Sequence, residues 1–141
     1  MNPDPLPRFV TAGDVIAEAS PWGVREPLCR PGLTGADRLY MVRMTMPPGY
    51  AHPFHRHPGT EEIIYVISGT AEQWVDRESR LLGAGELAYI PADTVHGTYN
   101  PGAGTLVFIA ILSAATAEPP STVDVSTAEP WRSLRADTAG A

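Results

Sequence analysis

Apolar and polar residues alternate along the middle of the chain, in short runs that turn residues separate. Alternation with a period of two is typical of β-strands that bury one face. The 13 glycines and 15 prolines supply turns between the runs. The pattern predicts six strands, at residues 38–46, 62–68, 70–76, 87–90, 95–99 and 105–112. Six short strands at this spacing favour an all-β sandwich or barrel in a single domain.

The two ends of the chain lack this alternation. Residues 1–36 contain six prolines, and among them only residues 10–19 are free enough of breakers to form a strand or a short helix. We therefore expect an N-terminal arm over residues 1–36, a barrel over residues 37–112 and a C-terminal tail over residues 113–141.

One part of the tail predicts secondary structure. Ser126 and Glu129 have the spacing of a helix capping box. Trp131 and Leu134 are three residues apart and would share one face of a helix. The tail is therefore expected to contain a short helix that docks by these two side chains.

Composition and charge narrow the classes of function. The 16 acidic and 10 basic residues give a net charge of −6, which argues against binding to nucleic acid or to an anionic membrane. All ten basic residues are arginine, so Schiff-base chemistry on a lysine amine is excluded. Cys29 is the only cysteine, and the first residues lack the pattern of a signal peptide. We expect a cytoplasmic protein without a membrane helix, since the longest apolar run, residues 106–112, is too short.

The histidines are concentrated, with three of the four in the segment 49–69. His55 and His57 are two residues apart, so in a strand they would project from one face, about 6.6 Å apart at their Cα atoms. A Pro-Gly turn follows, and Glu62 begins the next predicted strand, so a hairpin would place its carboxylate opposite the histidines. Imidazoles and a carboxylate without thiolate suit Fe(II), Mn(II), Ni(II) or Zn(II).

Two segments of the chain together resemble the sequence motifs of the cupin superfamily. The first motif, G(x)5HxH(x)3–4E(x)6G, is matched by Gly49, His55, His57, Glu62 and Gly69. The second motif, G(x)5PxG(x)2H(x)3N, is matched by Gly85, Pro91, His96 and Asn100. Asp93 stands where the second motif has glycine. Because aspartate tolerates the left-handed backbone conformation better than most residues, we expect the turn to be kept.

The resemblance implies a double-stranded β-helix, also called a jelly-roll barrel. It further implies one divalent metal ion (Fe, Mn, Ni or Zn) held by four ligands: His55, His57, Glu62 and His96. Glu61 fits the shorter spacing of the first motif, but it would leave seven residues before Gly69, so Glu62 is preferred.

Other polar residues have open roles. Glu62 and His52 are the candidate catalytic residues, although a surface position is the favoured interpretation for His52. Gln73 would bind substrate only if its strand face lines the barrel. Arg43 would either hold a substrate carboxylate or, as favoured, lie on an exposed strand face. The charged residues 76–80 indicate a solvated loop.

Three functions fit these residues. The first is a metal-dependent, dioxygenase-like enzyme that oxidises a small organic substrate or cleaves its ring with O2, since three histidines and one carboxylate leave open positions on a six-coordinate ion. The second is an isomerase, epimerase, lyase or polyketide cyclase, in which the ion is a Lewis acid and His52 moves a proton. The third is a non-catalytic sensor of a small ligand or metal. The fold does not choose among them.

The resemblance also bears on assembly. The outer strand face with Ile63, Tyr65 and Ile67 is too apolar to be left in water. Cupins commonly pair, often by lending an N-terminal strand to the partner. We therefore expect a homodimer with residues 8–19 near the interface.

Overall fold

The computed structural model describes residues 5–113 and 120–139, and nearly all of their regular structure is β. The elements in chain order are η1 (Ala12–Asp14), β1 (Glu18–Ser20), β2 (Gly23–Cys29), β3 (Tyr40–Met46), β4 (Ala51–Arg56), β5 (Glu62–Ser68), β6 (Ala71–Val75), β7 (Glu78–Leu82), β8 (Leu87–Ile90), β9 (His96–Tyr99), β10 (Leu106–Leu112), β11 (Val123–Asp124) and α1 (Trp131–Ala139). The all-β prediction is confirmed.

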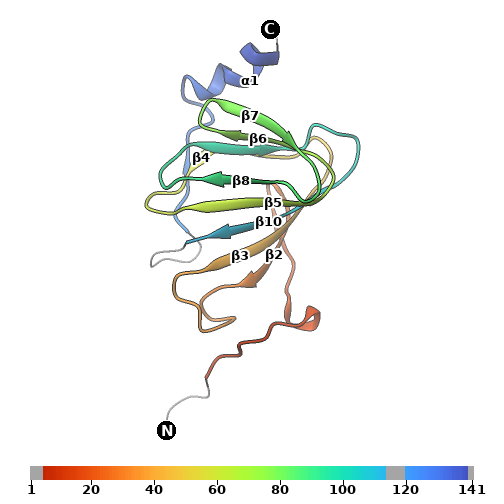
Figure 1. Ribbon diagram of the computed structural model, residues 1–141, viewed down its shortest axis with the longest axis vertical. Coiled ribbons are helices and arrows are strands. Elements are labelled where there is room, and N and C mark those ends of the chain that lie inside the picture. Colours follow the sequence, from red (N-terminus) through yellow and green to blue (C-terminus); the bar gives the residue numbers. More distant parts are fainter. Residues whose placement is uncertain (1–4, 114–119, 140–141) are drawn as a thin grey trace.

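The strands form two antiparallel sheets (Figure 1). The six-stranded sheet has the order β1-β2-β3-β10-β5-β8, and the five-stranded sheet has the order β11-β4-β9-β6-β7. Neighbours in each sheet are mostly distant in sequence, as the pairing of β10 with both β3 and β5 illustrates. This crossed connectivity is that of the double-stranded β-helix that the sequence motifs imply.

The predicted strands agree closely with the observed ones. The strands at 62–68 and 87–90 have the predicted bounds, and the other four differ by one or two residues at an end. The interpretation of residues 76–80 as a solvated loop is wrong in part, because the turn ends at Arg77 and β7 begins at Glu78. β7 is an edge strand with four exposed residues, so its charged side chains fit an edge that must resist pairing with another chain.

The proline-rich N-terminal part contributes more to the barrel than the sequence predicts. Strand structure was expected only within residues 10–19, yet β1 and β2 extend the six-stranded sheet as far as Cys29. β1 pairs only with the first three residues of β2. Pro27, which has no N–H to donate, therefore lies where that edge of β2 has no neighbouring strand. Gly23 permits the packing of β2 on β3, because a Cβ at its φ of 126° would lie 2.2 Å from the Thr45 carbonyl oxygen. Residues 5–17 extend away from the barrel (Figure 1).

The main core is built from alternate residues of the central strands. β3 shows the alternation most clearly, with Tyr40, Val42, Met44 and Met46 buried. Arg43 lies on the opposite face of this strand and forms an ion pair of 3.0 Å with Glu26, which confirms the favoured interpretation of an outward-facing side chain. The core also contains buried residues of β5 and β10: Ile64, Val66, Leu106, Phe108, Ala110 and Leu112.

A second apolar cluster lies under the C-terminal helix, at the end of the molecule opposite to the N-terminus (Figure 1). We call Phe54, Trp74 and Tyr99 the outer aromatic cluster. Trp131 and Leu134 pack against it, so the predicted docked helix is present. The predicted capping box is wrong, because α1 begins only at Trp131. In its place, the Ser126 hydroxyl donates to Asp124 and Glu129 accepts from residues of the first helical turn.

Candidate metal centre

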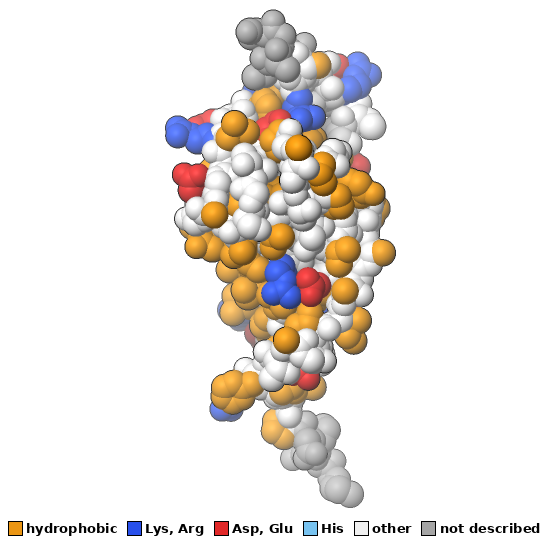
Figure 2. All heavy atoms as spheres, turned by 90° about the vertical axis from the view of Figure 1, so that its right-hand side faces the viewer, with side chains coloured by type: hydrophobic (Ala, Val, Ile, Leu, Met, Phe, Trp, Pro, Cys, Tyr) orange, Lys and Arg blue, Asp and Glu red, His pale blue; other side chains and the backbone are white. Residues whose placement is uncertain are grey.

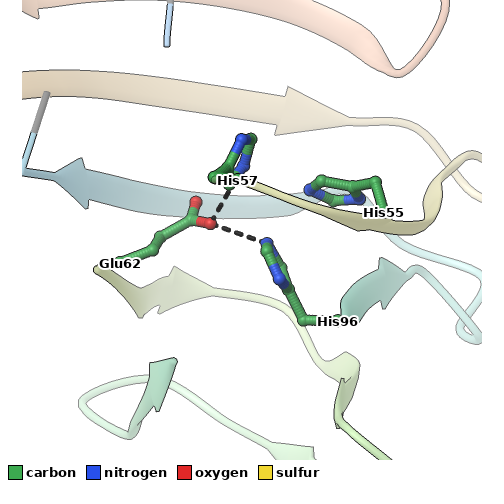
Figure 3. Close-up of side chains that lie close together, drawn as sticks. All are labelled: His55, His57, Glu62 and His96. Carbon is green, nitrogen blue, oxygen red and sulfur yellow. Dashed lines mark ion pairs between the residues drawn. The ribbon is translucent and has the colours of Figure 1, made fainter. Parts of the chain in front are cut away.

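The structure brings together the four residues that the cupin motifs implied as metal ligands. They come from three strands and a turn: His55 on β4, His57 just after β4, Glu62 at the start of β5 and His96 at the start of β9. All four are buried, and one ligand atom from each lies within 4.8 Å of the others (Figure 3). We call these residues the ligand cluster. It is compatible with a metal site, and its composition does not single out one metal.

Backbone pairing explains why these residues meet. β4 and β9 are neighbours, and His55 lies directly opposite His96 in their register. The Pro-Gly turn after His57 reverses the chain and brings Glu62 back to the same place, as the spacing predicts.

Asp93 supports this turn from the second motif. Its φ is 65°, so the expected left-handed conformation is confirmed at the position where the motif has glycine. Its N–H donates to the His57 carbonyl at 3.2 Å. Its carboxylate accepts from the Gly59 N–H at 3.3 Å. The departure from the motif therefore adds a link between the two motif segments.

Each histidine of the cluster is oriented through its Nδ1 atom. The acceptors are backbone carbonyl oxygens, at 2.6 Å for His55, 2.9 Å for His57 and 2.9 Å for His96. A carbonyl oxygen only accepts, so each Nδ1 carries the hydrogen and each Nε2 of a neutral ring has a free lone pair. All three rings are thus in the tautomer that presents Nε2 as a metal ligand.

The contacts at the centre of the cluster show what kind of group its ligand atoms could hold. Glu62 Oε1 lies 2.7 Å from His96 Nε2 and 3.4 Å from His57 Nε2 (Figure 3). The Nε2 atoms of His55 and His96 and Glu62 Oε1 are buried without a hydrogen-bond partner. Lone pairs at such distances repel each other unless a proton or a metal ion lies between them. The donor set therefore fits a divalent cation.

Electrostatics keep the Glu62 carboxylate charged and the Nε2 lone pair of His55 free. Burial opposes the charge on Glu62, but the adjacent imidazoles of His57 and His96 outweigh it and lower the pKa of Glu62 to about 2. Burial lowers the pKa of His55 to about 2. Burial would also lower the pKa of His57, yet the adjacent Glu62 raises it above its ordinary value. A proton therefore competes with a metal ion for His57.

His52 is not a surface residue, so the favoured interpretation of its position is wrong. Its ring is stacked between Trp22 and His55, with ring centroids 3.8 Å and 3.6 Å apart. Its Nε2 atom is buried and has no hydrogen-bond partner among the described residues. Burial lowers its pKa to about 3, so the imidazole is neutral near pH 7. The spacing of the histidines does not reveal the burial of His52, because Trp22 comes from the turn between β1 and β2, far from His52 in the sequence.

The ligand cluster forms part of the wall of a cavity of about 120 Å³. Most of the other lining side chains are apolar or aromatic: Trp22, Tyr40, Val42, Met44, Ile64, Phe108, Ala110 and Leu112. Arg25 also lines the cavity, and its guanidinium donates to the Tyr40 hydroxyl at 2.5 Å. Sequence reasoning missed Arg25 and Trp22 because it assigned them to an arm. Arg25 lies on β2 and Trp22 in the turn before it, and the prolines around them hide the strand pattern that could have revealed both.

The other residues with open roles lie outside this cavity. Gln73 is buried and accepts a hydrogen bond of 2.6 Å from the Thr98 hydroxyl, and Thr98 in turn lines the cavity. Gln73 therefore positions a lining residue. Arg43 faces outward with Glu26 and does not line the cavity, so it does not hold a substrate there.

The part of the chain that carries the ligand cluster matches a known protein family. The family model described as "Cupin domain" matches residues 42–112, which is half of the chain and contains the whole ligand cluster. This chain belongs to the cupin family. The match ends before the C-terminal segment and begins after Trp22 and Arg25, so part of the wall of this cupin's cavity lies outside it.

Named relatives vary widely in function. The chain is 32% identical over 98 residues to mannose-1-phosphate guanylyltransferase of Escherichia coli, an alignment that covers 70% of the chain and 20% of that protein. It is 32% identical over 96 residues to polyketide synthase CurC of Streptomyces cyaneus, covering 68% of the chain and 62% of CurC. A solved oxalate oxidase is 26% identical with a TM-score of 0.55, covering 62% of this chain and 46% of that one. The chain thus spans about a fifth of the guanylyltransferases that it matches first.

Within residues 5–113 and 120–139, no helix is both long and apolar enough to cross a bilayer.

Proposed function

We propose that this cupin is a metal-dependent enzyme that oxidises a small organic anion with O2. The observation that carries the proposal is the position of the ligand cluster, whose buried and unpaired ligand atoms face a largely apolar cavity. Three imidazoles and one carboxylate leave two positions of a six-coordinate ion for other ligands. When bound, a divalent ion supplies Lewis acidity and, if it is iron or manganese, redox chemistry.

The charge of the cavity wall supports an anionic substrate. Among the described residues that line the cavity, only Arg25 and Glu62 have a formal charge when the histidines are neutral. These two charges cancel, so a divalent ion would give the wall a net charge of +2. The contact of Arg25 with Glu18 is 3.7 Å long, whereas its contact with the Tyr40 hydroxyl is 2.5 Å. The Arg25 guanidinium could therefore bind the carboxylate or enolate group of a substrate, and the apolar walls could contact the rest of that substrate.

The likeness to oxalate oxidase supports oxidation. That protein's name states an oxidation, and it is 26% identical to this chain. The ligand set also suits iron and manganese, the metals that such chemistry needs.

His52 favours a second candidate function, which is Lewis-acid catalysis without O2. Its unpartnered Nε2 is buried beside the ligand cluster, and the residue lines the cavity. There it would hold a substrate hydroxyl or receive a proton while the metal polarises a carbonyl. The similarity to CurC supports a polyketide-like substrate for this isomerase, lyase or cyclase chemistry.

One experiment separates these proposals from each other. Metal-reconstituted protein is incubated with phenolic, β-diketone and polyketide-like acids, with and without O2, and product masses are recorded. Consumption of O2 that needs both metal and substrate supports oxidation. Turnover that persists in an anaerobic chamber and with Zn(II) contradicts oxidation and supports the second candidate. Ligand binding without product for every metal would favour a non-catalytic sensor.

We also propose that the protein is a homodimer. Large apolar side chains are exposed along the N-terminal segment, where Phe9 is 85% and Ile16 is 71% exposed. The outer face of the six-stranded sheet adds Tyr65 and Ile67, which are 37% and 45% exposed. Figure 2 shows one side of the molecule, on which hydrophobic side chains cover much of the barrel; a basic and an acidic side chain lie together among them, and more charged side chains lie toward the end that carries α1. A second copy would cover these groups. Light scattering should give twice the 15.1 kDa of one chain, and a monomer would contradict the proposal.

A further inference from the structure

The three histidines of the ligand cluster differ in what holds their rings. His55 and His96 each donate Nδ1–H to a carbonyl only two residues earlier in the chain. His57 donates instead to the carbonyl of Ser121, at 2.9 Å, which lies 64 residues further along the chain. Two ligands are therefore oriented by their own segments, and the third depends on the C-terminal part of the protein.

Backbone pairing brings this part of the protein to His57. β11 pairs with β4, and Asp124 lies opposite His55 in their register. The pairing continues beyond β11, where the Val125 N–H donates to the Phe54 carbonyl at 3.1 Å. β11 has only two residues, so this short ladder alone holds the Ser121 carbonyl weakly.

The helix that follows supplies the missing anchor. Trp131 and Leu134 pack against the outer aromatic cluster. Arg135 forms a forked ion pair with Glu72, at 2.7 Å and 2.9 Å. Its guanidinium also lies 3.8 Å from the centre of the Tyr99 ring. These contacts bind α1 to the barrel and thereby hold the segment that precedes it.

The same segment also forms part of the cavity wall. Pro120 and Thr122, on either side of Ser121, both line the cavity. The Thr122 hydroxyl lies 3.4 Å from His57 Nδ1, so a second group of the segment is next to the same ring atom.

We infer that residues 120–136 act as a C-terminal clasp that positions His57 as a metal ligand. The inference rests on the proposed metal centre. A carbonyl that accepts from Nδ1 keeps the ring in the tautomer with a free Nε2 and makes that nitrogen a better ligand. Because the acceptor is a backbone atom, side chains control it only through the docking of the clasp. The anchor under α1 therefore sets the metal affinity from the other face of the sheet.

Loosening the anchor tests this inference. Arg135→Gln combined with Trp131→Ala, which we call the anchor variant, removes two anchoring side chains and leaves every ligand in place. We expect Co(II) to bind about tenfold more weakly, which is the usual cost of losing a group that orients a ligand. Affinity is measured by competition with a chromophoric chelator. The matched control is Arg132→Gln on the same helix, because Arg132 is paired with Glu129 and not with the barrel. This control variant should bind Co(II) as the original chain does.

A double-mutant cycle separates positioning from general loss of stability. When Arg135→Gln and Trp131→Ala are added to His57→Ala, they should cause no further loss of Co(II) affinity, because the ligand that the clasp positions is already gone. Nitrogen NMR of the metal-free proteins gives a second readout. His57 should keep its Nδ1–H tautomer in the original chain and show a mixture of tautomers in the anchor variant, while His55 and His96 stay unchanged.

Each outcome bears on the inference in a defined way. Unchanged Co(II) affinity in the anchor variant, or an equal loss with and without His57, would overturn it. If the double variant does not fold, the milder Arg135→Gln and Trp131→Phe variants should give smaller losses in the same direction. If the original chain binds no Co(II), the proposed metal centre fails, and the NMR tautomer of His57 still decides whether the clasp positions its ring.

Discussion

Around β9, the five-stranded sheet is buried on both faces, and the two faces are built from opposite kinds of residue. The face toward the cavity carries His55, His96 and Thr98. The opposite face carries the outer aromatic cluster, which is covered by α1. Neighbouring residues on one strand, such as Phe54 and His55, therefore serve different purposes. The inner face buries polar groups at a cost that a bound cation offsets, and the outer face stabilises the strands that hold those groups.

The largest expected effect comes from removing a ligand on the inner face. Glu62→Gln and His57→Ala should each lower metal affinity by about a hundredfold to a thousandfold, since each removes roughly a quarter of the binding free energy of a four-ligand site. Chelator competition measures the affinity. His52→Ala should lose far less affinity, and a loss equal to that of His57→Ala would make His52 a ligand and redraw the inner face.

Truncation on the outer face should have the opposite profile. Phe54→Ala removes a buried ring that packs on Trp74, Tyr99 and Trp131, so it should destabilise the protein by about 3–5 kcal/mol. Urea denaturation measures this loss. The metal affinity of the folded variant should fall much less than in Glu62→Gln. A thousandfold loss of affinity would show that the two faces are not separable in this way.

Metal removal links the two faces through stability. A chelator should lower the melting temperature by several degrees, since metal at a thousandfold excess over its Kd stabilises the folded state by about 4 kcal/mol. Adding metal back should restore the original curve. The Glu62→Gln variant should not respond to either treatment. Identical melting curves for the original chain with and without metal would contradict the metal centre.

Acid should weaken metal binding through His57. Burial opposes protonation of this residue, but Glu62 raises the pKa of His57 above its usual value. A proton on His57 must leave before the ring can bind metal, so affinity is full above this raised pKa and falls as the pH drops through it. Below it, we expect about a tenfold loss per pH unit. Titrations of Co(II) from pH 8 to pH 6 measure this slope. A flat profile would place the competing proton elsewhere.

The smallest expected effect concerns the substrate end of the cavity. Benzoate should bind metal-loaded protein more tightly than neutral benzamide, and Arg25→Gln should weaken benzoate binding about tenfold by removing a charged hydrogen-bond donor. Quenching of Trp22 fluorescence reports binding at the cavity. Arg43→Gln is the matched control, because Arg43 lies on the outer face of β3 with Glu26. Equal losses in the two variants would remove Arg25 from the site.

Much of the inner face could be predicted from the sequence, because its residues are placed by local rules. The two-residue spacing of His55 and His57, the turn that follows and the start of the next strand bring Glu62 to the same ion. Asp93 took the backbone conformation that its residue type and motif position predict. The alternation of apolar and polar residues likewise located the six predicted strands, whose ends differ from the observed ones by at most two residues.

Tertiary structure decided what lies around that centre. The burial of His52 depends on Trp22, and the charge of the cavity depends on Arg25, both from a proline-rich stretch without a clear strand pattern. The ring of His57 is held by a carbonyl 64 residues away. Spacing along the chain determines which side chains share a strand face, since that depends only on backbone geometry. It does not determine which distant segment covers the face, because that choice is made by packing the whole chain into one core.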